Sequence, residues 1–546
     1  MKRKAVAAVL TAVMVASMFT GCGSDNGSSS AKSASAASAA SAANDTVDED
    51  GKVNGIMYQE GLPLVDEGDY TFSIFCDDSS ESGEFIMLDE FKKQTNVDVD
   101  LKIYPYETAT ERLNLDLNSG DYADVIGGWT LSDNAILTYG VNQGVFIPLE
   151  DYFEKYCPNI SAILDLPGVR EKMTAPDGHI YTIPYVCADS TVGYSPYINT
   201  KWLENVGMSM PTTTDEFEAV LKAFKEQDAN GNGDASDEIP FSTDPNNKHI
   251  EAMAGYFGLP MNKLGIAIQN EKVVYGGVSN TYREFLSWFH KLYADGLVDV
   301  ELYTQDSSTW EGKGNQDLYG VSIAYGSGEF TGIPAAEERG DFDSMPVLNT
   351  DKDGIWLRDT EGFSVYRTQA VITNKAEHPE IICRWFDNAF ALENGIGCNR
   401  GPVGVIVNKE DDGYHAIDTT TLSEEDQEKY SWGNLWPQSL PKYLPADFEF
   451  VEEHPMYDEK KATEEAYEAN LTKEIIPSYW IDLDKIDTFS DTNTAIKDFF
   501  EQQQAQFVCG ELDIDNDADW QAYVDGMYSL GLEDWVATQG IEEIAK

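Results

Sequence analysis

Apolar and polar residues alternate at the two-residue period of a β-strand in two neighbouring stretches, residues 70–74 and 97–103. Between these stretches, residues 84–94 carry Phe85, Leu88 and Phe91 at three-residue steps, which is typical of an amphipathic helix. A strand, a helix and a strand in this order predict a crossover unit with parallel pairing. We therefore expect an α/β fold.

The ends of the predicted strands indicate where a ligand could bind. A second helix is expected over residues 109–118, and a short apolar strand at residues 124–126 runs directly into Gly127, Gly128 and Trp129. In open α/β sheets, ligands bind beyond the carboxyl ends of the strands. Residues 76–79 and 127–129 should therefore lie at the edge of a ligand crevice.

A stretch rich in oxygen-bearing side chains, residues 228–240, follows another predicted helix. Thr213 and Glu216 have the spacing of a capping box, and apolar residues from Phe217 to Phe224 recur at helical positions. The stretch then places polar residues at every second position, and Gly231 and Gly233 allow its backbone to curl.

Calcium is the metal that this pattern favours, because a hard cation takes about six to eight oxygen ligands. The candidate ligands are Asp228, Asn230, Asn232, Asp234, Asp237 and Glu238. The loop begins like an EF-hand, in which Asp234 would offer its carbonyl oxygen, but Ile239 stands at the closing position, so Asp237 or Glu238 must close the site. The alternative is a solvated Asn-Gly turn. A calcium ion here would be structural, because an all-protein oxygen cage leaves little room for an activated water.

The N-terminus predicts secretion and lipid attachment. Residues 1–21 combine a basic tip at residues 2–4, an apolar run over residues 5–19 and small residues before Cys22, which is typical of a lipoprotein signal peptide. Cys22 would then receive diacylglycerol, and acyl chains such as palmitate would hold the protein on the extracytoplasmic face of the cell membrane. Phe19 departs from the leucine that the bacterial lipobox prefers, and an unmodified Cys22 behind an ordinary signal peptide is the alternative.

Composition divides the rest of the chain. Residues 22–60 are predicted to form a flexible tether, since residues 23–44 are nearly all Ser, Ala and Gly and residues 45–49 are acidic. Residues 61–546 exceed what one hydrophobic core usually organises, so we expect two lobes. With 37 basic and 96 acidic residues the net charge is −59, which argues against nucleic acid or an anionic membrane surface as a ligand.

Signatures of catalysis are absent from the sequence. The six histidines form no His-Glu-x-x-His, and the chain has no Gly-x-Ser-x-Gly, P-loop or complete Gly-x-Gly-x-x-Gly. A glycosidase needs only two carboxylates, so the acidic residues leave that possibility open. No Cys-x-x-Cys occurs, and the spacing of Cys383 and Cys398 fits a disulfide and two buried thiols equally well.

Several segments, in the same order along the chain, resemble family 1 extracellular solute-binding proteins of carbohydrate ABC importers. They are residues 122–126 (Tyr-Ala-Asp-Val-Ile), 144–149, 174–178, 181–185 (Tyr-Thr-Ile-Pro-Tyr), 199–203 and 510–514. The resemblance extends from about Tyr70 to the C-terminus. Longer members of the family carry a calcium loop at the place of residues 228–240, with the closing Asp-Glu one residue earlier, so Ser236 reads as an insertion.

The resemblance implies two α/β lobes that are joined by two or three crossing strands and close on a sugar like a hinge. Residues 181–186 should lead into the first crossing, and residues 363–373 should return the chain. This assigns residues of about 66–186 and 370–410 to the first lobe and about 187–362 and 411–546 to the second. The implied partners are a carbohydrate and the permease subunits of an ABC transporter, and we expect a monomer.

A sugar ring has apolar C–H faces and a rim of hydroxyl groups, so its receptor needs aromatic platforms and planar amides or carboxylates. The candidate ligand-binding residues are Asp77, Trp129, Asp189, Tyr325, Phe330, Trp432 and Trp436. The alternatives are core packing for Trp129, a turn or cap role for the two aspartates, a simple loop at residues 325–330, and cover by a neighbouring lobe for the last two tryptophans.

Taken together, these patterns predict a lipid-anchored binder that captures a carbohydrate and releases it to a permease without a covalent step. The size of the chain and its family resemblance favour an oligosaccharide. Two alternatives remain open from the sequence: a secreted carbohydrate-active enzyme, and a sugar-sensing lipoprotein without a transport role.

Overall fold

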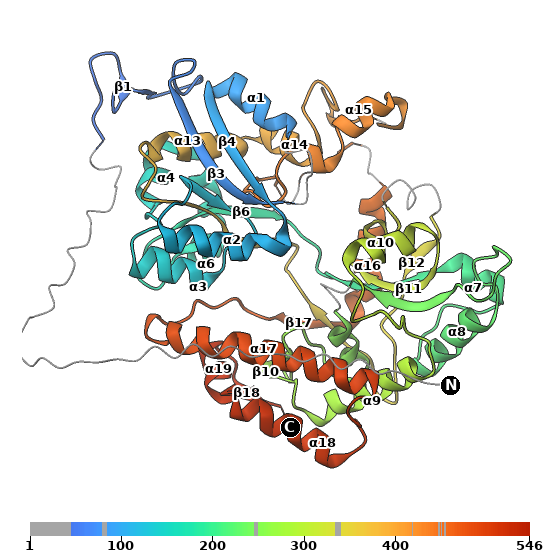
Figure 1. Cartoon of the computed structure of the whole chain (residues 1–546). Helices are drawn as coiled ribbons and strands as arrows, with labels where there is room; N and C mark the ends of the chain where they lie inside the picture. Colours follow the sequence, from blue (N-terminus) through green and yellow to red (C-terminus); the bar gives the residue numbers. More distant parts are fainter. Residues whose placement is uncertain are drawn as a thin grey trace, which may run out of the picture. The chain divides into compact units, whose positions relative to one another are not determined.

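The computed structural model describes residues 45–78, 84–244, 249–332, 340–417, 419–445, 448, 450–451 and 455–545 (Figure 1). The predicted signal peptide, Cys22 and the first part of the predicted tether lie outside the described residues. None of the described helices combines the length and the apolar character that crossing a membrane requires.

The first lobe is built on a five-stranded sheet in the order β4-β3-β5-β14-β6. One half is the predicted crossover unit, β3 (Tyr70–Asp77), α1 (Ile86–Thr95) and β4 (Val97–Tyr104), followed by α2 (Tyr106–Ser119) and β5 (Val125–Gly127). β3 pairs in parallel with both β4 and β5. The other half is β6 (Thr182–Ala188) and β14 (Phe363–Ile372), and β14 runs antiparallel to β5 and to β6. The α/β class predicted from the sequence is confirmed.

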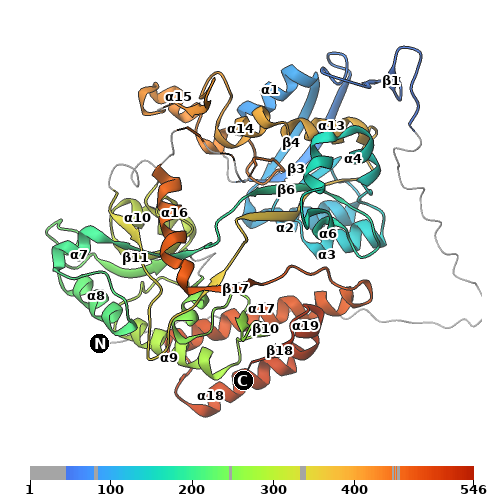
Figure 2. The same cartoon turned by 180° about the vertical axis from the view of Figure 1, so that it is seen from behind.

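Two hydrophobic clusters cover the two faces of this sheet, because successive residues of a strand point to opposite faces. Phe72 of β3 lies in one cluster with Phe91 of α1 and Trp385 of α13 (Pro379–Ala389). Phe75 lies in the other cluster with Leu113 of α2. Figures 1 and 2 show further helices around the sheet. Those labelled there are α3 (Asp133–Ala135), α4 (Glu150–Tyr156), α6 (Val169–Met173) and α14 (Leu392–Arg400). The same part of the chain also forms the π-helix η2 (Ile136–Asn142) and α5 (Pro158–Leu164).

The crossing strands β6 and β14 are hydrogen-bonded to each other. Their pairing runs from Phe363 opposite Ala188 to Val371 opposite Thr182, and its register is irregular between Tyr366 and Ala370. The connections between the first and second sheets therefore leave from a paired ribbon rather than from separate strands, which restricts how each can move alone.

Arg367, in the irregular part of β14, ties a distant segment to this ribbon. Its side chain is 5% exposed, and its guanidinium pairs with Asp133 and donates hydrogen bonds to the carbonyl oxygens of Ser478 (3.3 Å) and Tyr479 (2.7 Å). The ring centroid of Trp480 lies 4.2 Å from the guanidinium carbon. Residues 478–480 are therefore held against the crossing strands by charge and by stacking.

The second lobe contains a four-stranded sheet in the order β12-β7-β11-β8. Its strands are β7 (Ser195–Asn199), β8 (Ile239–Thr243), β11 (Tyr319–Ala324) and β12 (Phe342–Ser344). β11 pairs in parallel with β8 and antiparallel with β7. A large hydrophobic cluster joins this sheet to α8 (Thr214–Glu226), α9 (Asn280–Ala294) and the C-terminal helices α17 (Ile486–Cys509), α18 (Asp517–Ser529) and α19 (Leu532–Thr538).

Shorter elements complete the second lobe. A three-stranded sheet has the order β18-β10-β9, and β13 pairs in parallel with β17. These elements and their companions are α7 (Thr200–Val206), the 3-10 helix η3 (Ile250–Phe257), β9 (Ile266–Gln269), β10 (Lys272–Tyr275), α10 (Ser307–Asn315), α11 (Gly328–Thr331), β13 (Trp356–Arg358), α16 (Pro455–Tyr467), η6 (Glu468–Asn470), β17 (Leu471–Ile475), η7 (Leu483–Lys485) and β18 (Glu543–Ile544).

Two segments pack with the first lobe although the predicted boundaries place them elsewhere. The predicted tether includes the hairpin β1 (Lys52–Val53) and β2 (Met57–Tyr58), and Val53 and Met57 are buried in the first-lobe core. Trp436 and Leu440, which the predicted boundary assigns to the second lobe, are buried in the same core. Neither segment carries a long periodic pattern, so its packing partner could not be inferred locally.

Residues 407–434, which precede Trp436 in the chain, form further short elements. They are the hairpin β15 (Val407–Glu410) and β16 (Gly413–Ala416), the 3-10 helices η4 (Thr419–Thr421) and η5 (Trp432–Asn434), and α15 (Glu424–Lys429).

Candidate functional site

A tight loop after β5 places Trp129 beside the end of β3. Gly128 adopts a φ of 134°, and a side chain at this position would collide with the carboxylate of Asp77. Asp77 is fully buried, and its two oxygens accept hydrogen bonds from the backbone N–H groups of Trp129 (2.9 Å) and Thr130 (2.6 Å). The carboxylate thus holds the loop and does not face a ligand, and burial raises its pKa.

Trp129 forms an aromatic group with the two crossing strands. The tryptophan is 45% exposed, and its ring lies edge-on to Tyr366 of β14 at a centroid distance of 5.2 Å. Tyr366 is the register partner of Tyr185 on β6, and their ring centroids are 5.5 Å apart. An accessible indole backed by two half-buried phenols is a platform suited to the apolar face of a ligand ring.

Asp189, just after the first crossing strand, links this aromatic group to the second lobe. Its Oδ2 accepts hydrogen bonds from Ser364 Oγ (2.5 Å) and Tyr366 OH (3.1 Å), both on β14. Its Oδ1 accepts from Ser190 N–H (2.9 Å) and from Tyr325 OH (3.1 Å). A carboxylate has about four acceptor positions. Those of Asp189 are therefore taken by protein donors, which gives the residue an organising role.

Lys460 of α16 fixes the backbone around Tyr325. Its ammonium donates hydrogen bonds to the carbonyl oxygens of Gly193 (2.5 Å) and Tyr325 (2.7 Å), and it lies 3.9 Å from the centroid of the Tyr325 ring. Tyr194 lies 6.1 Å from the Tyr325 ring and stacks on His249 at 4.0 Å. One cation thus joins the segments after β6 and after β11.

Two carboxylates flank Lys460. Glu329 accepts a hydrogen bond from the backbone N–H of Tyr325 (2.9 Å), and Asp359 accepts one from Gly193 N–H (2.6 Å). Both residues are exposed, yet desolvation by the neighbouring protein raises the pKa of Glu329 to about 7 and that of Asp359 to about 6. Desolvation also lowers the pKa of Lys460 to about 8.

The structure brings together four of the predicted ligand residues and separates three. Asp77, Trp129, Asp189 and Tyr325 belong to the connected group just described. Phe330 is fully buried against Trp310, Tyr319 and Phe342, and Trp436 is fully buried between Phe91 and Trp385. Neither ring offers a face to a ligand, so we leave Phe330 and Trp436 out of the proposed site.

Trp432 stays a surface residue with 54% exposure. Its ring centroid lies 5.5 Å from the ammonium of Lys442, which is itself buried. The residue sits in a turn that leads into the first-lobe core through Trp436. It therefore lies on the first lobe, whereas the boundaries predicted from the sequence place it on the second lobe.

Sequence reasoning missed Tyr185, Tyr366, Glu329, Asp359 and Lys460 as members of the group. The two tyrosines could have been found, because each lies on a predicted crossing segment and the pairing of those segments sets them opposite each other. The charged residues carry no local signal, since the chain has 96 acidic side chains and these lie on separate elements.

The predicted calcium loop folds around its own polar side chains. Asp237 accepts hydrogen bonds from the amides of Asn230 (3.4 Å) and Asn232 (2.7 Å), so three predicted ligands meet. Asp228 Oδ2 accepts from Gly233 N–H at 3.0 Å. The side chain of Asp234 accepts instead from the backbone N–H (3.1 Å) and the hydroxyl (2.6 Å) of Ser236.

Glu238 tests whether a cation fits this loop. Its Oε1 accepts a hydrogen bond from Ala229 N–H at 2.8 Å, whereas its Oε2 is buried and has no hydrogen-bond partner among the described residues. Burial raises the pKa of this carboxyl group. A buried carboxylate oxygen without a partner is costly, and a calcium ion would satisfy it, so the residues of the loop fit the predicted metal.

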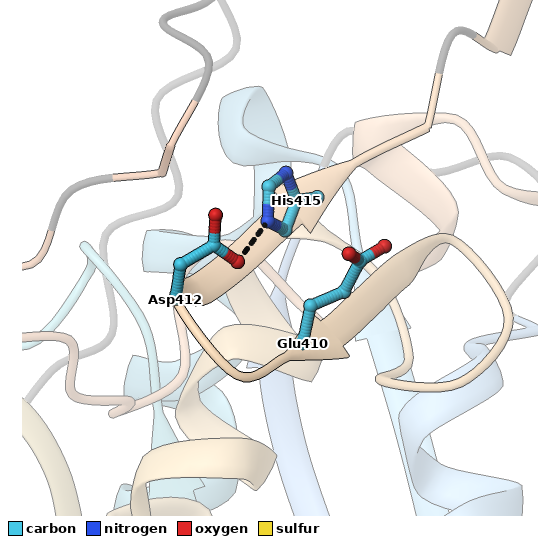
Figure 3. Close-up of side chains that lie close together, drawn as sticks. All are labelled: Glu410, Asp412 and His415. Atoms are coloured by element: carbon cyan, nitrogen blue, oxygen red, sulfur yellow. Dashed lines mark hydrogen bonds and ion pairs between the residues drawn. The ribbon is translucent and has the colours of Figure 1, made fainter.

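A different trio of metal-type side chains lies on the β15–β16 hairpin. Glu410, Asp412 and His415 bring one ligand atom each within 4.8 Å of one another, and His415 Nε2 lies 3.0 Å from Asp412 Oδ1 (Figure 3). Glu410 and Asp412 are exposed, so solvent already satisfies these groups. The trio serves as a comparison site for the loop at residues 228–238.

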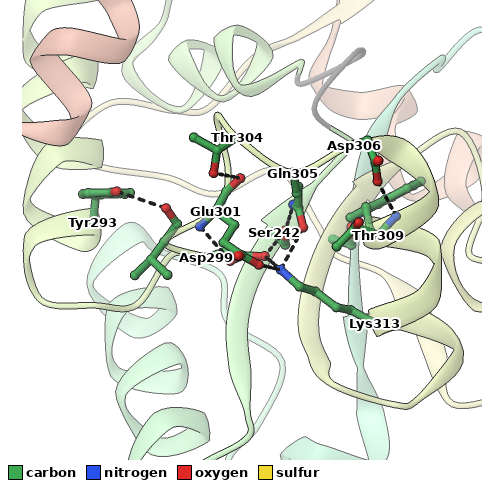
Figure 4. Close-up of polar contacts among 12 residues, drawn as sticks. Ser242, Tyr293, Asp299, Glu301, Thr304, Gln305, Asp306, Thr309 and Lys313 are labelled. Carbon is green, nitrogen blue, oxygen red and sulfur yellow. Dashed lines mark hydrogen bonds and ion pairs between the residues drawn. The ribbon is translucent and has the colours of Figure 1, made fainter. Parts of the chain in front are cut away.

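A buried polar network near β8 is fully used in holding the second lobe together. Lys313 donates hydrogen bonds to Asp299 (2.9 Å) and Gln305 (2.8 Å) and pairs with Glu301 at 2.7 Å (Figure 4). Asp299 also accepts from Ser242 Oγ at 3.1 Å. Lys313 thus links buried Asp299 to exposed Glu301 and holds this part of the second lobe together.

The described cysteines are free thiols. Cys383 and Cys398 are both buried, and the thiol that interacts with Cys383 is that of Cys157. The short sequence separation of Cys383 and Cys398 therefore does not identify the nearest thiol in space.

Residues 78–395 match the family model described as bacterial extracellular solute-binding protein. The matched range is more than half of the chain. The chain belongs to this family. Extracellular solute-binding proteins of this kind are two-lobed, which agrees with the two sheets and the paired crossing strands described above.

This solute-binding protein is 31% identical over 411 residues to the fructooligosaccharide ABC transporter substrate-binding protein FusA of Streptococcus pneumoniae serotype 4 (strain ATCC BAA-334 / TIGR4), over 73% of this chain and 70% of FusA. It is 28% identical over 280 residues to lipoprotein LipO of Bacillus subtilis (strain 168), over 50% of this chain and 52% of LipO.

Solved structures give the same picture. The structure of S. pneumoniae FusA in complex with kestose has a TM-score of 0.75 and 26% identity, and it covers 86% of this chain and 98% of that chain. An EF-hand mutant of FusA in complex with fructo-nystose has a TM-score of 0.72, also at 26% identity, with the same coverage of both chains.

The raised pKa of Glu329 predicts how the stability of this solute-binding protein depends on pH. Desolvation, reinforced by Asp244 and Glu311, outweighs the opposing effects of Tyr325 N–H and Lys460 and gives a pKa of about 7, against 4.5 for an ordinary glutamate. The folded state therefore binds this proton more tightly, and the resulting stability is fully present below pH 4.5 and is lost as the pH rises through about 7.

Glu329→Gln keeps the side chain neutral at every pH. We expect the melting temperature of the variant, relative to the unmodified protein, to be higher at pH 8 than at pH 5, as measured by differential scanning calorimetry. Glu474→Gln, at an exposed position of β17, is the matched control for the loss of one charge. An equal difference at both pH values would contradict the assignment.

Proposed function

We propose that this solute-binding protein captures a carbohydrate, and specifically an oligosaccharide, between its two lobes and delivers it to the permease subunits of an ABC transporter. The observation that carries the proposal is the exposed Trp129, held by Asp77 beside Tyr185 and Tyr366 of the crossing strands. The relationship to FusA, which is named for fructooligosaccharides, supports the same class of ligand.

Each member of the group has a physical role in this proposal. The indole of Trp129 stacks on the C–H face of a sugar ring, and the Tyr185 and Tyr366 rings back it. Asp189 accepts hydrogen bonds from the hydroxyl groups of Tyr325 and Tyr366, so it orients both phenols from opposite lobes. A ligand that touches residues of both lobes binds the closed form better than the open form, and this difference in affinity drives closure.

Capture and release of the sugar involve no catalytic step. Stacking and hydrogen bonding are reversible, so the sugar leaves chemically unchanged when the lobes open. Enzymatic turnover is the competing function, and it would shorten the glycans that are recovered after a binding experiment.

We expect the purified full-length protein to bind oligosaccharides in isothermal titration calorimetry with a panel of defined glycans. Trp129→Ala should weaken the affinity by about 30-fold, equivalent to about 2 kcal/mol, because the main aromatic platform is lost. Tyr528→Ala, at an equally accessible aromatic on α18, should leave the affinity unchanged. Recovered glycans should be intact by chromatography. Shortened glycans, or binding that is indifferent to Trp129, would contradict the proposal.

We propose that residues 228–238 hold a structural calcium ion. The ion would be bound by the side chains of Asp228, Asn230, Asn232 and Asp237, by the backbone carbonyl of Asp234, and by the unpaired oxygen of Glu238. Amides that now donate to Asp237 would turn their oxygen atoms inward. The description of a solved FusA structure as an EF-hand mutant supports the proposal. Bound calcium would pin the end of α8 to β8.

Removal of calcium should lower stability. With free calcium at about a hundred times its dissociation constant, binding contributes about 2.7 kcal/mol, so a chelator should lower the melting temperature measurably. The double variant Asp228→Ala, Asp237→Ala should melt at the same temperature with and without chelator. Glu410→Gln, Asp412→Asn, at the exposed trio of Figure 3, should retain the full chelator effect. Absence of calcium in elemental analysis of the unmodified protein would refute the site.

We also propose that the protein is a monomer anchored at Cys22 to the extracytoplasmic face of the cell membrane. The basic tip, the apolar run and the small residues before Cys22 support this, as does the relationship to a protein named lipoprotein LipO. Cys22→Ser should move the protein from the membrane fraction to the medium. Cys509→Ser, at an exposed cysteine, should stay in the membrane fraction. Release of both variants alike would contradict lipid attachment at Cys22.

A further inference from the structure

Acidic side chains dominate the second-lobe side of the ligand site. We name Asp189, Glu329, Asp359, Glu459 and Glu464 the acid cluster. They are connected through short contacts: Glu464 accepts from Ser190 Oγ (2.7 Å) and Thr191 N–H (2.8 Å), and Glu459 accepts from Ser327 N–H (2.8 Å) and Oγ (2.6 Å). Asp359 lies close enough to Asp189 for their repulsion to contribute to its raised pKa. The cluster thus surrounds the backbone on which Tyr194 and Tyr325 stand.

The members of the cluster differ in how far their acceptor capacity is used. Asp189, Glu459 and Glu464 each accept at least two hydrogen bonds from protein donors. Among the described residues, Glu329 and Asp359 each accept a single backbone hydrogen bond and also reach solvent. A carboxylate has about four acceptor positions, so these two retain the capacity to accept hydrogen bonds from a ligand.

The nearby cations offset only part of this charge. The ammonium of Lys460 is bound by two carbonyl oxygens and by the Tyr325 ring. On the first lobe, Lys442 is 1% exposed and donates to Gln438 Oε1 at 2.5 Å. Arg400 is half-buried and donates to the carbonyl oxygen of Asn399 at 3.2 Å. The acid cluster thus sets five carboxylates against one adjacent ammonium, that of Lys460, so a free anionic group of a ligand would meet a net negative charge.

We propose that the acid cluster makes the site selective for uncharged oligosaccharides over uronic-acid oligomers, with Glu329 and Asp359 accepting hydrogen bonds from sugar hydroxyl groups. The inference rests on the proposed carbohydrate-binding function and narrows its ligand class. Glu329 and Asp359 would also give the second lobe its own contacts with the sugar. Such contacts are needed because closure depends on a ligand that touches both lobes.

The selectivity follows from the energetics of hydrogen bonding to a charged acceptor. A hydroxyl group that donates to a carboxylate makes a charge-assisted hydrogen bond, which is stronger than a neutral one. A uronate in the same place presents a second carboxylate, and two like charges a few ångströms apart repel strongly where protein displaces water. Rejection by like charge is a common source of specificity.

Calorimetry with size-matched probes tests the inference. The neutral probes are kestose, maltotriose and cellotriose, and the acidic probes are trigalacturonate and a trimeric alginate, all at pH 8 and low salt so that the cluster is ionised and unscreened. We expect at least one neutral probe to bind about a hundredfold or more tightly than either acidic probe. In Glu329→Gln, Asp359→Asn, the affinity for that neutral probe should fall about tenfold, and the gap to the acidic probes should shrink.

A matched control separates the local cluster from the net charge of −59. Asp353→Asn, Glu474→Gln removes the same two charges from another part of the second lobe, where both residues line a surface pocket of about 520 Å³. It should change neither affinity nor selectivity. An acidic probe that binds as tightly as the neutral ones would overturn the inference and leave the carbohydrate-binding function standing. If neither class binds, the proposed function itself fails. Equal effects of the two double variants would show that the net charge, and not this cluster, sets the selectivity.

Discussion

One carboxylate, that of Asp189, connects the crossing strands to the second lobe. Asp189 leaves the first crossing strand, accepts two hydrogen bonds from the second crossing strand, and accepts a third from Tyr325 of the second lobe. A carboxylate that receives several hydrogen bonds is fixed in position, and it fixes its donors in turn. The orientation of Tyr366 beside Trp129 and the position of the Tyr325 loop therefore depend on the same atoms. Lys460 reinforces this arrangement by holding the backbone on both sides of it.

The first lobe contributes its part through rigidity. Asp77 has no contact with solvent, yet it decides where Trp129 stands, because both of its oxygens are bound by the loop that carries the indole. Gly128 permits the close approach, since any side chain there would occupy the space of the Asp77 carboxylate. An accessible aromatic ring is thus mounted on buried backbone contacts. In the proposed binding role, the ring would meet a ligand without a further loss of conformational freedom of the loop.

The sequence predicted the secondary structure correctly where the hydrophobic period of a strand or helix extends over enough residues, as in β3, α1 and β4. The unit β3, α1 and β4 follows from alternation and three-residue steps. The rule that ligands bind beyond strand ends drew attention to Asp77 and Trp129, which the structure brings together, with Asp77 buried beneath the loop that carries Trp129. Aromatic residues in irregular segments were harder. Phe330 and Trp436 looked accessible because their segments have no period, but distant elements cover them. Glu329, Asp359 and Lys460 meet only through the tertiary fold, and nothing in the sequence around them distinguishes them from other charged residues.

The N-terminal hairpin has a mechanical consequence. Lys52 pairs with Asp66 at 2.6 Å, and Asn54 donates a hydrogen bond to Glu380 at 2.9 Å, so the chain enters the first lobe and is fastened there before any strand of the second lobe begins. If the lipid anchor lies where we propose, the tether attaches to the first lobe alone. The first lobe would then stay fixed relative to the bilayer, and the second lobe would move during opening and closing. Solvent drag and crowding would then act mainly on the second lobe, which carries the acid cluster. The motion of this lobe would also set the orientation that the protein presents to a transporter.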